Sequence, residues 1–269
     1  MVLVTALGGM FLAARATRVA LDWRAVLQAL GGIGAVVGGA NALNMYLERH
    51  TDALMERTRD RPLPAGRLRP ATALGFGLAL SLAALLALGL ATNAATTVLA
   101  ALALALYVLV YTPLKRHTDF ALLIGAVPGA MPPLLGWTAV TGQVGAAGLG
   151  LFGVLFFWQL PHFIAIAVLR CDDYVRAGIR VLPAVRGARQ ARWYAVAYLA
   201  PLYGVSLALA PLGLAGPGYV ATATVLAVGS LYAALRGFGA PGPLRWARSL
   251  FVASLVYLPL LMAAVMVGW

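Results

Sequence analysis

Long apolar runs separated by short polar segments account for almost all of the 269 residues. Each run is close to the roughly 20 apolar residues that cross a bilayer as an α-helix. The hydrophobic fraction is 62%, and only 10% of the residues are charged, against about 25% in a typical soluble domain. We therefore expect an all-α polytopic membrane protein that forms one domain over residues 1–269. The pattern predicts nine spans, at about residues 1–14, 25–47, 72–91, 95–112, 119–139, 147–169, 192–211, 217–235 and 248–268.

Positive charge is concentrated on one side of the predicted bundle. Of the 20 lysines and arginines, 17 lie in the loops after the second, fourth, sixth and eighth spans. Such loops remain cytoplasmic, so we expect a cytoplasmic N-terminus and an external C-terminus. The net charge of +12 is then explained by basic loops that set the orientation in the membrane and that bind an anionic ligand. We therefore expect no nucleic-acid partner. Residues 1–14 lack the basic start of a cleavable signal peptide, and we assign them to a first span that is short or incomplete.

Seven of the eight acidic residues lie in or beside three polar segments. Carboxylates are costly in a membrane and usually serve a function there. In the first segment, Asn44, Glu48 and Asp52 are spaced by four residues, so they lie along one stripe of a helix. Three oxygen ligands on one face suit Mg²⁺, which also binds water and substrate phosphates. The stripe indicates a metal site at the membrane edge; the alternative is a solvated helix end with ordinary caps.

Basic residues follow this stripe and close the fourth span. Arg57, Arg59 and Arg61 come directly after it, and the planar guanidinium group suits bidentate contact with phosphate oxygens. Lys115 and Arg116 are candidates for contact with the distal phosphate group. Both sets could serve only as topology signals, and their spacing leaves the two interpretations open.

A second acidic pair follows the sixth span. Asp172 and Asp173, with Tyr174 beside them, are candidates for a second metal site. The alternative is a solvated acidic loop.

Polar side chains also occur inside apolar spans. Gln159 and His162 lie beside Trp158 in the sixth span, and we expect them to face the bundle interior. His162 is a candidate ligand for haem iron, although we favour a hydrogen-bonded interior histidine. The fifth span contains helix breakers that predict an irregular helix beside a cavity, with close helix packing as the alternative. These breakers are Gly125, Pro128, Gly129, Pro132, Pro133 and Gly136.

Four blocks of the chain resemble the UbiA superfamily of intramembrane aromatic prenyltransferases: residues 44–67, 111–137, 157–174 and 177–183. The most specific runs are Met55-x-Arg57-Thr58-Arg59-x-Arg61-Pro62-Leu63-Pro64 and Trp158-Gln159-x-Pro161-His162-Phe163. The second run and Asp172-Asp173-Tyr174 are similar to the haem-farnesylating branch, the protoheme IX farnesyltransferases or haem O synthases.

The resemblance implies nine transmembrane helices around a central cavity that opens toward the cytoplasm, in the cell (inner) membrane. The implied reaction is Mg²⁺-dependent transfer of farnesyl from farnesyl diphosphate to a vinyl group of haem B, with addition of water. Its products are haem O and diphosphate. A downstream haem A synthase is an implied candidate partner. The implied catalytic metal ligands are Asn44, Glu48, Asp52, Asp172 and Asp173. The implied diphosphate contacts are Arg57, Arg61, Lys115, Arg116 and Tyr174. The implied acceptor pocket contains Trp158, Gln159 and His162.

Two departures from the family pattern change the expectations. Glu48 stands where the family usually has aspartate, and its extra methylene is expected to shift the position or affinity of the metal. The basic motif that the family has before its first span is absent. The alternative functions are a prenyltransferase that acts on a quinone or phenolic acceptor, and a non-catalytic haem or lipid carrier. A carrier of neutral cargo does not require two carboxylate clusters.

Overall fold

The computed structural model describes residues 1–239 and 242–267, and every regular element within these residues is helical. This confirms the all-α architecture. The elements are α1 (Val2–Thr17), α2 (Trp23–Asp52), α3 (Pro70–Ala91), α4 (Ala94–Ala105), the π-helix η1 (Leu106–Tyr111), α5 (Thr112–Leu114), α6 (Ala121–Thr141), α7 (Ala146–Leu169), α8 (Cys171–Arg176), α9 (Leu182–Arg186), α10 (Ala188–Leu207), α11 (Pro217–Leu235), the 3₁₀ helix η2 (Arg236–Phe238) and α12 (Pro243–Val267).

Each predicted span coincides with a helix, but the count of nine spans is not confirmed. Within the described residues, seven helical segments are long and apolar enough to cross a membrane. Helix α1 is apolar but has only 16 residues. Helix α10 has 20 residues but carries Arg189 and Arg192 near its start, and it is not among the seven. Residue 268, the end of the last predicted span, lies outside the described residues.

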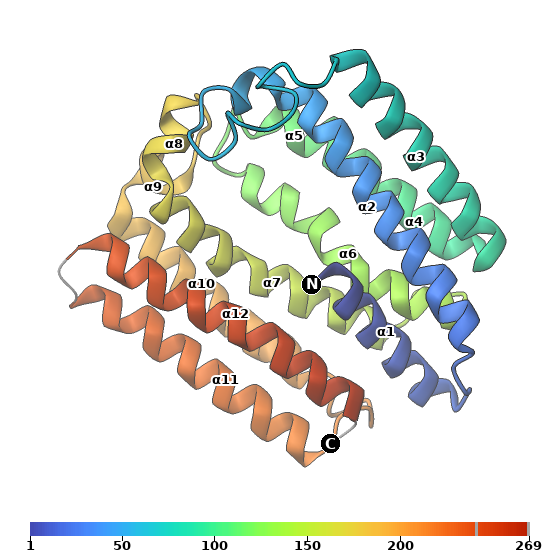
Figure 1. Ribbon diagram of the computed structural model, residues 1–269. Coiled ribbons are helices and arrows are strands. Elements are labelled where there is room, and N and C mark those ends of the chain that lie inside the picture. Colours follow the sequence, from blue (N-terminus) through green and yellow to red (C-terminus); the bar gives the residue numbers. More distant parts are fainter. Residues whose placement is uncertain (240–241, 268–269) are drawn as a thin grey trace.

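The helices pack around two apolar cores. One core joins α7, α10, α11 and α12 with residues of α1 and α6, and the other joins α1, α2, α3, α4 and α6. Figure 1 shows that the α2–α3 loop, α5, α8 and α9 gather at one end of the bundle. The segments that carry the predicted polar residues are therefore neighbours in space, although they are far apart in the sequence.

The outer surface of the bundle is apolar. Leu90 on α3 is 91% exposed, Leu109 on η1 70%, and Val225 on α11 71%. An apolar exterior of this extent is unfavourable in water but suits a lipid environment, as expected for helices that cross a bilayer.

The glycines of α6 allow neighbouring segments to pack closely against the helix. The helix is continuous although Pro128, Pro132 and Pro133 lie inside it. A Cβ atom built on Gly136 would lie 1.9 Å from the carbonyl oxygen of Ala6 on α1. This contact agrees with the packing alternative. The expected cavity is also present in part, since a small apolar cavity of about 150 Å³ lies beside Pro128 and Pro132.

The Gly136 contact gives a stability prediction. Replacing Gly136 by Ala forces α1 and α6 apart, and overpacking of this kind costs about 1–3 kcal/mol. Gly229 on α11 is the matched control, because a Cβ atom there meets nothing within 4 Å. Thermal unfolding in detergent should show a lower Tm for Gly136→Ala and an unchanged or slightly higher Tm for Gly229→Ala, because alanine favours a helix more than glycine does. Equal Tm values for the two variants would contradict the close contact.

Candidate active site

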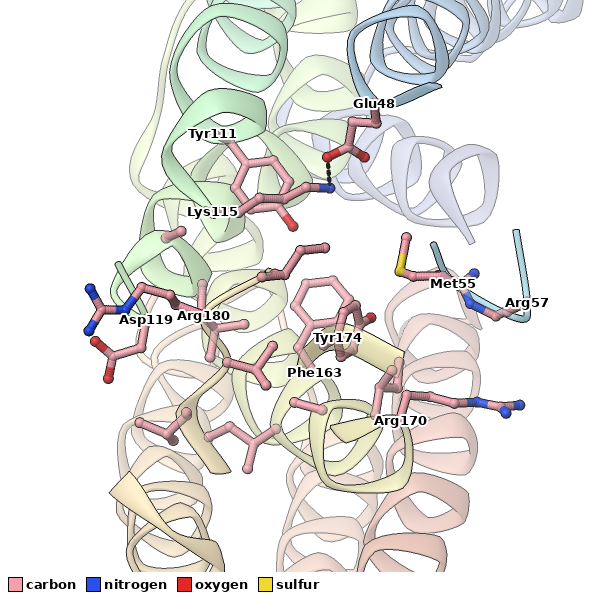
Figure 2. A pocket seen from close by; sticks show the side chains of 18 of the residues that line it. Glu48, Met55, Arg57, Tyr111, Lys115, Asp119, Phe163, Arg170, Tyr174 and Arg180 are labelled. Atoms are coloured by element: carbon pink, nitrogen blue, oxygen red, sulfur yellow. Dashed lines mark ion pairs between the residues drawn. The ribbon is translucent and has the colours of Figure 1, made fainter. Parts of the chain in front are cut away.

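A cavity of about 540 Å³ lies at the end of the bundle where the polar segments meet. Its wall is formed by the end of α2 and the loop after it, by η1 with Lys115, by the start of α6, by the end of α7, and by α8 with residues 179–182. Phe251 of α12 completes it. The α7 side is apolar, with Phe163, Ile164 and Ala167, whereas the α2 side is polar (Figure 2). An apolar molecule with a charged end fits this division.

The predicted stripe on α2 lies on the cavity wall. Asn44, Glu48 and Asp52 all line the cavity and are only 8%, 4% and 2% exposed. They share a face because α2 continues as one regular helix of 30 residues to Asp52. A solvated helix end would leave such side chains exposed, so the burial favours the site interpretation of the stripe.

Both carboxylates of the stripe have cationic partners. Lys115 forms an ion pair with Glu48 (Figure 2), and Arg61 Nη1 lies 2.8 Å from Asp52 Oδ2. The loop after α2 turns back so that Arg61 can reach Asp52. One of its bonds is donated by Thr58 Oγ1 to the backbone oxygen of Asp52, at 2.8 Å. The charges of the stripe are therefore neutralised within the fold.

The second acidic pair is divided between the interior and the surface. Asp173 is buried and accepts hydrogen bonds from Arg176 and from the backbone N–H of Glu56. The hydrogen bond from Arg176 holds the pKa of the Asp173 carboxyl below its ordinary value. Asp172 is exposed, because neighbours on a helix point about 100° apart. Neither aspartate lines the cavity, whereas Tyr174 does.

The cavity has a cationic border. The predicted Arg57, Arg61 and Lys115 line it, whereas the predicted Arg116 is exposed and does not. Two arginines that line it, Arg170 and Arg180, were not among the predicted site residues. Arg170 stands two residues before Asp172 of the acidic pair, and this position was the available signal for it.

The predicted acceptor residues lie behind the apolar wall. Gln159 Nε2 donates to the backbone oxygen of Ala126 on α6, at 2.7 Å, and Trp158 Nε1 donates to the backbone oxygen of Ser254. The His162 ring stacks between Trp158 and Phe251, with ring centroids 4.9 and 5.0 Å apart. None of the three predicted residues lines the cavity, although Phe251 does.

The tautomer of His162 follows from its hydrogen bonds. Ser254 Oγ donates its single hydrogen to the backbone oxygen of Phe251, at 2.6 Å. The same oxygen atom lies 2.8 Å from His162 Nδ1, so it accepts a hydrogen from that nitrogen. Nε2 is then the unprotonated nitrogen of the neutral ring. This arrangement agrees with a hydrogen-bonded interior histidine.

Comparison with known proteins identifies the family of this chain. The model of the UbiA prenyltransferase family matches residues 2–255. The chain belongs to the UbiA prenyltransferase family. It is 53% identical to a protein named protoheme IX farnesyltransferase from Sorangium cellulosum (strain So ce56), over the full length of both chains. It is 51% identical to a protein of the same name from Anaeromyxobacter sp. (strain Fw109-5), over the whole of this chain and 89% of the relative.

Solved structures of UbiA proteins share the fold at low sequence identity. A structure of digeranylgeranylglyceryl phosphate synthase superimposes with a TM-score of 0.81 at 17% identity, covering 98% of this chain and 92% of the other. A UbiA homologue from Archaeoglobus fulgidus, bound to DMAPP and Mg²⁺, gives a TM-score of 0.68 at 14% identity, covering 100% and 97%. The bundle described above is therefore a UbiA fold.

The donor atoms of the α2 stripe fit a magnesium ion. Asn44, Glu48 and Asp52 line the cavity with oxygen-bearing side chains, and Mg²⁺ is usually bound by one or two carboxylates, with water and substrate phosphates as the other ligands. Within residues 1–239 and 242–267, no group of three or more His, Cys, Asp or Glu side chains lies close enough together to hold a metal ion.

The Lys115–Glu48 ion pair gives a second stability prediction. Lys115→Met leaves Glu48, with a side chain only 5% exposed, as a buried charge without its partner, which costs roughly 3–5 kcal/mol. Adding Glu48→Gln to this variant removes the charge and should recover most of the loss. Thermal unfolding in detergent measures both effects. A Lys115→Met protein as stable as the wild type would contradict the pairing.

Proposed function

We propose that this protein transfers a farnesyl group from farnesyl diphosphate to a vinyl group of haem B and adds water, producing haem O and diphosphate. The observation that carries the proposal is the 53% identity, over the full length of both chains, to a protein named protoheme IX farnesyltransferase. The cavity supports it, because a charged end and an apolar wall suit an isoprenoid diphosphate.

The donor site would hold Mg²⁺ at the α2 stripe. Asn44, Glu48 and Asp52 are the proposed ligands. When bound, Mg²⁺ neutralises negative charge on the diphosphate leaving group. Asp173 lies on the neighbouring α8 and accepts a hydrogen bond from the backbone N–H of Glu56, in the loop after α2. Of the acidic pair, it is therefore the stronger candidate for a second ion. Asp172 is exposed and would act as a metal ligand only if α8 rotates toward the cavity when the substrate binds.

The cations of the border would hold the diphosphate. Lys115 and Arg61 now neutralise Glu48 and Asp52, and we propose that they exchange these carboxylates for diphosphate oxygens in the loaded enzyme. Arg57 and Tyr174 line the same cavity and are placed to contact the diphosphate as well. Charge-assisted hydrogen bonds of this kind are about twice as strong as neutral ones. Arg116 is exposed and would contact diphosphate only at the mouth.

Breaking the allylic C–O bond sends its electron pair to the diphosphate and leaves a farnesyl cation. The stacked rings of Tyr107 and Tyr111, 5.6 Å apart, line the cavity, and aromatic faces attract a cation. The π electrons of the haem vinyl group form the new C–C bond. Water then adds to the cation formed beside the porphyrin ring and loses a proton. The apolar wall limits premature capture of the farnesyl cation by water.

The acceptor would lie against the α7 side of the cavity. Phe163, Ile164 and Phe251 form this apolar wall, and we propose that it contacts the porphyrin face. Trp158, Gln159 and His162 would shape the wall from behind through their bonds to α6 and α12. We also propose that the cavity opens to the cytoplasm, since the Arg-rich loops gather at its end of the bundle.

A product assay tests the proposed function. Purified protein in detergent is incubated with haem B, farnesyl diphosphate and Mg²⁺, and the pigments are separated by liquid chromatography and mass spectrometry. We expect a haem heavier by farnesyl plus water, and no product when EDTA removes the metal. Product from a phenolic acceptor, and none from haem, would assign a different acceptor.

The same assay tests the metal ligands. Asp52→Ala and Asp173→Ala should lower the rate by at least about 100-fold while leaving folded protein. Near-normal rates in both variants would contradict the metal assignment.

Glu48→Asp tests the departure from the family pattern. The shorter side chain keeps a carboxylate on the stripe, so we expect an active enzyme whose Mg²⁺ requirement differs from that of the wild type. Titration of the initial rate with Mg²⁺ measures this difference. Complete loss of activity in a folded Glu48→Asp protein would show that the site requires the longer side chain. Glu48→Gln, which removes the charge at the same length, is the matched control and should be far less active.

A further inference from the structure

We propose that Thr112 is a positioning residue of the donor site: its hydroxyl group fixes the orientation of the Asn44 amide, so that the amide oxygen is directed to the cavity. This inference rests on the proposed function, in which Asn44 is a metal ligand. Thr112 itself is buried, does not line the cavity and would act through Asn44.

A short chain of hydrogen bonds connects Asn44 to the backbone of η1. Asn44 Nδ2 lies 3.0 Å from Thr112 Oγ1, and both residues are buried. Thr112 Oγ1 in turn lies 2.8 Å from the backbone oxygen of Tyr107. The chain therefore joins the proposed metal ligand on α2 to the helix that carries Tyr107, Tyr111 and Lys115.

The direction of these hydrogen bonds follows from donor and acceptor chemistry. A hydroxyl group has one hydrogen to donate, and a backbone carbonyl oxygen can only accept. Thr112 therefore donates to Tyr107 and presents a lone pair to Asn44. Only the NH₂ group of the amide can donate to that lone pair. A rotated amide would place its oxygen against the Thr112 oxygen, so the network assigns the amide orientation and leaves the oxygen of Asn44 for the cavity.

The π-helical turn is what brings the Thr112 hydroxyl to this position. The backbone N–H of Thr112 also bonds the Tyr107 oxygen, five residues earlier, whereas an α-helix joins residues four apart. The turn thus contains one additional residue, which rotates the following residues by about 100° relative to a regular helix. π-Turns inside helices occur frequently at functional sites, and this one directs Thr112 to Asn44.

Loss of the Thr112 hydroxyl should weaken metal binding without removing a ligand. In Thr112→Val the amide loses its acceptor, and only the cation itself then favours the orientation in which the amide oxygen faces the metal. Residues that orient a metal ligand typically contribute 10- to 100-fold to metal affinity. Thr112→Ser keeps the hydroxyl group and should retain affinity. Asn44→Asp, added to Thr112→Val, replaces the amide by a carboxylate that presents oxygen in either orientation, and should restore binding.

The experiment measures metal binding directly. Purified full-length protein in detergent is titrated with Mn²⁺, a paramagnetic substitute for Mg²⁺, in the presence of an unreactive farnesyl thiolodiphosphate, and free Mn²⁺ is measured by EPR. We expect Thr112→Val to raise the Kd for Mn²⁺ by roughly 10-fold or more, with Thr112→Ser close to the wild type and Thr112→Val/Asn44→Asp recovering most of the loss. The Mg²⁺ concentration for half-maximal rate should rise in parallel.

Thr96→Val is the matched control. Thr96 is fully buried, and its hydroxyl group lies 3.1 Å from Asn93 Oδ1 and 2.9 Å from Thr138 Oγ1, on side chains that do not line the cavity. This variant should lose stability but keep the wild-type Kd for Mn²⁺. An equal loss of affinity in Thr96→Val and Thr112→Val, or an unchanged affinity in Thr112→Val, would overturn the inference.

The same titration separates this inference from the proposed function. A wild-type protein that binds Mn²⁺ with the analogue, responds to Thr112→Val and makes no farnesylated haem would contradict the acceptor assignment and support the role of Thr112. A wild-type protein that makes haem O but binds Mn²⁺ equally well with valine at position 112 would contradict only the role of Thr112. Absence of Mn²⁺ binding to the wild type would overturn the inference, since Asn44 would then not be a metal ligand.

Discussion

The ion pairs of Glu48 with Lys115 and of Asp52 with Arg61 determine how the polar end of the bundle is built. Two carboxylates on a buried helix face would each cost several kcal/mol if left uncompensated. The cations that neutralise them come from two different segments, the loop after α2 and the end of the η1–α5 segment. Both segments must therefore fold back to the same stretch of α2, and this requirement closes one wall of the cavity.

Much of the surrounding structure serves these contacts. The loop after α2 is held by its own hydrogen bonds, including that from Thr58 to the Asp52 backbone, and by Asp173, which accepts from the Glu56 backbone. The π-turn sets the rotation of the helix before Lys115. The packed glycines of α6 anchor α1 to the same half of the bundle. The charged groups that would bind a metal and a diphosphate thus also hold in place the loop and the helical segment that form the cavity wall.

Hydrophobic runs and residue spacing were sufficient to predict the helices and the α2 stripe. A spacing of four residues defines a helix face whatever the tertiary structure, and the cost of burying a carboxylate in an apolar segment indicated that this face was functional. The number of membrane-crossing helices was less accessible, because α10 combines an apolar sequence with arginines and α1 is short. The short helices α8 and α9 were not predicted, because six and five residues are too few to show a helical repeat of apolar positions.

The division between cavity wall and supporting residues could not be predicted from the sequence. Asp172 and Asp173 are adjacent, and only the helical geometry of α8 decides that one is exposed and the other buried. Gln159 and His162 were correctly expected to face the interior, but their hydrogen bonds join them to α6 and α12 rather than to the cavity. Arg170 and Arg180 reach the cavity because α7 ends and the following segment turns there. Of the two, only Arg170 had a signal in the sequence, its position beside the acidic pair.

We propose that Lys115 and Arg61 exchange their carboxylate partners for diphosphate when the donor binds. The most direct test is an experimental structure of the protein with Mg²⁺ and farnesyl thiolodiphosphate, in a lipid nanodisc. We predict that Lys115 Nζ and the Arg61 guanidinium group contact diphosphate oxygens, with Glu48 and Asp52 on the metal. A bound diphosphate elsewhere in the cavity, with both ion pairs of the α2 stripe intact, would contradict the claim.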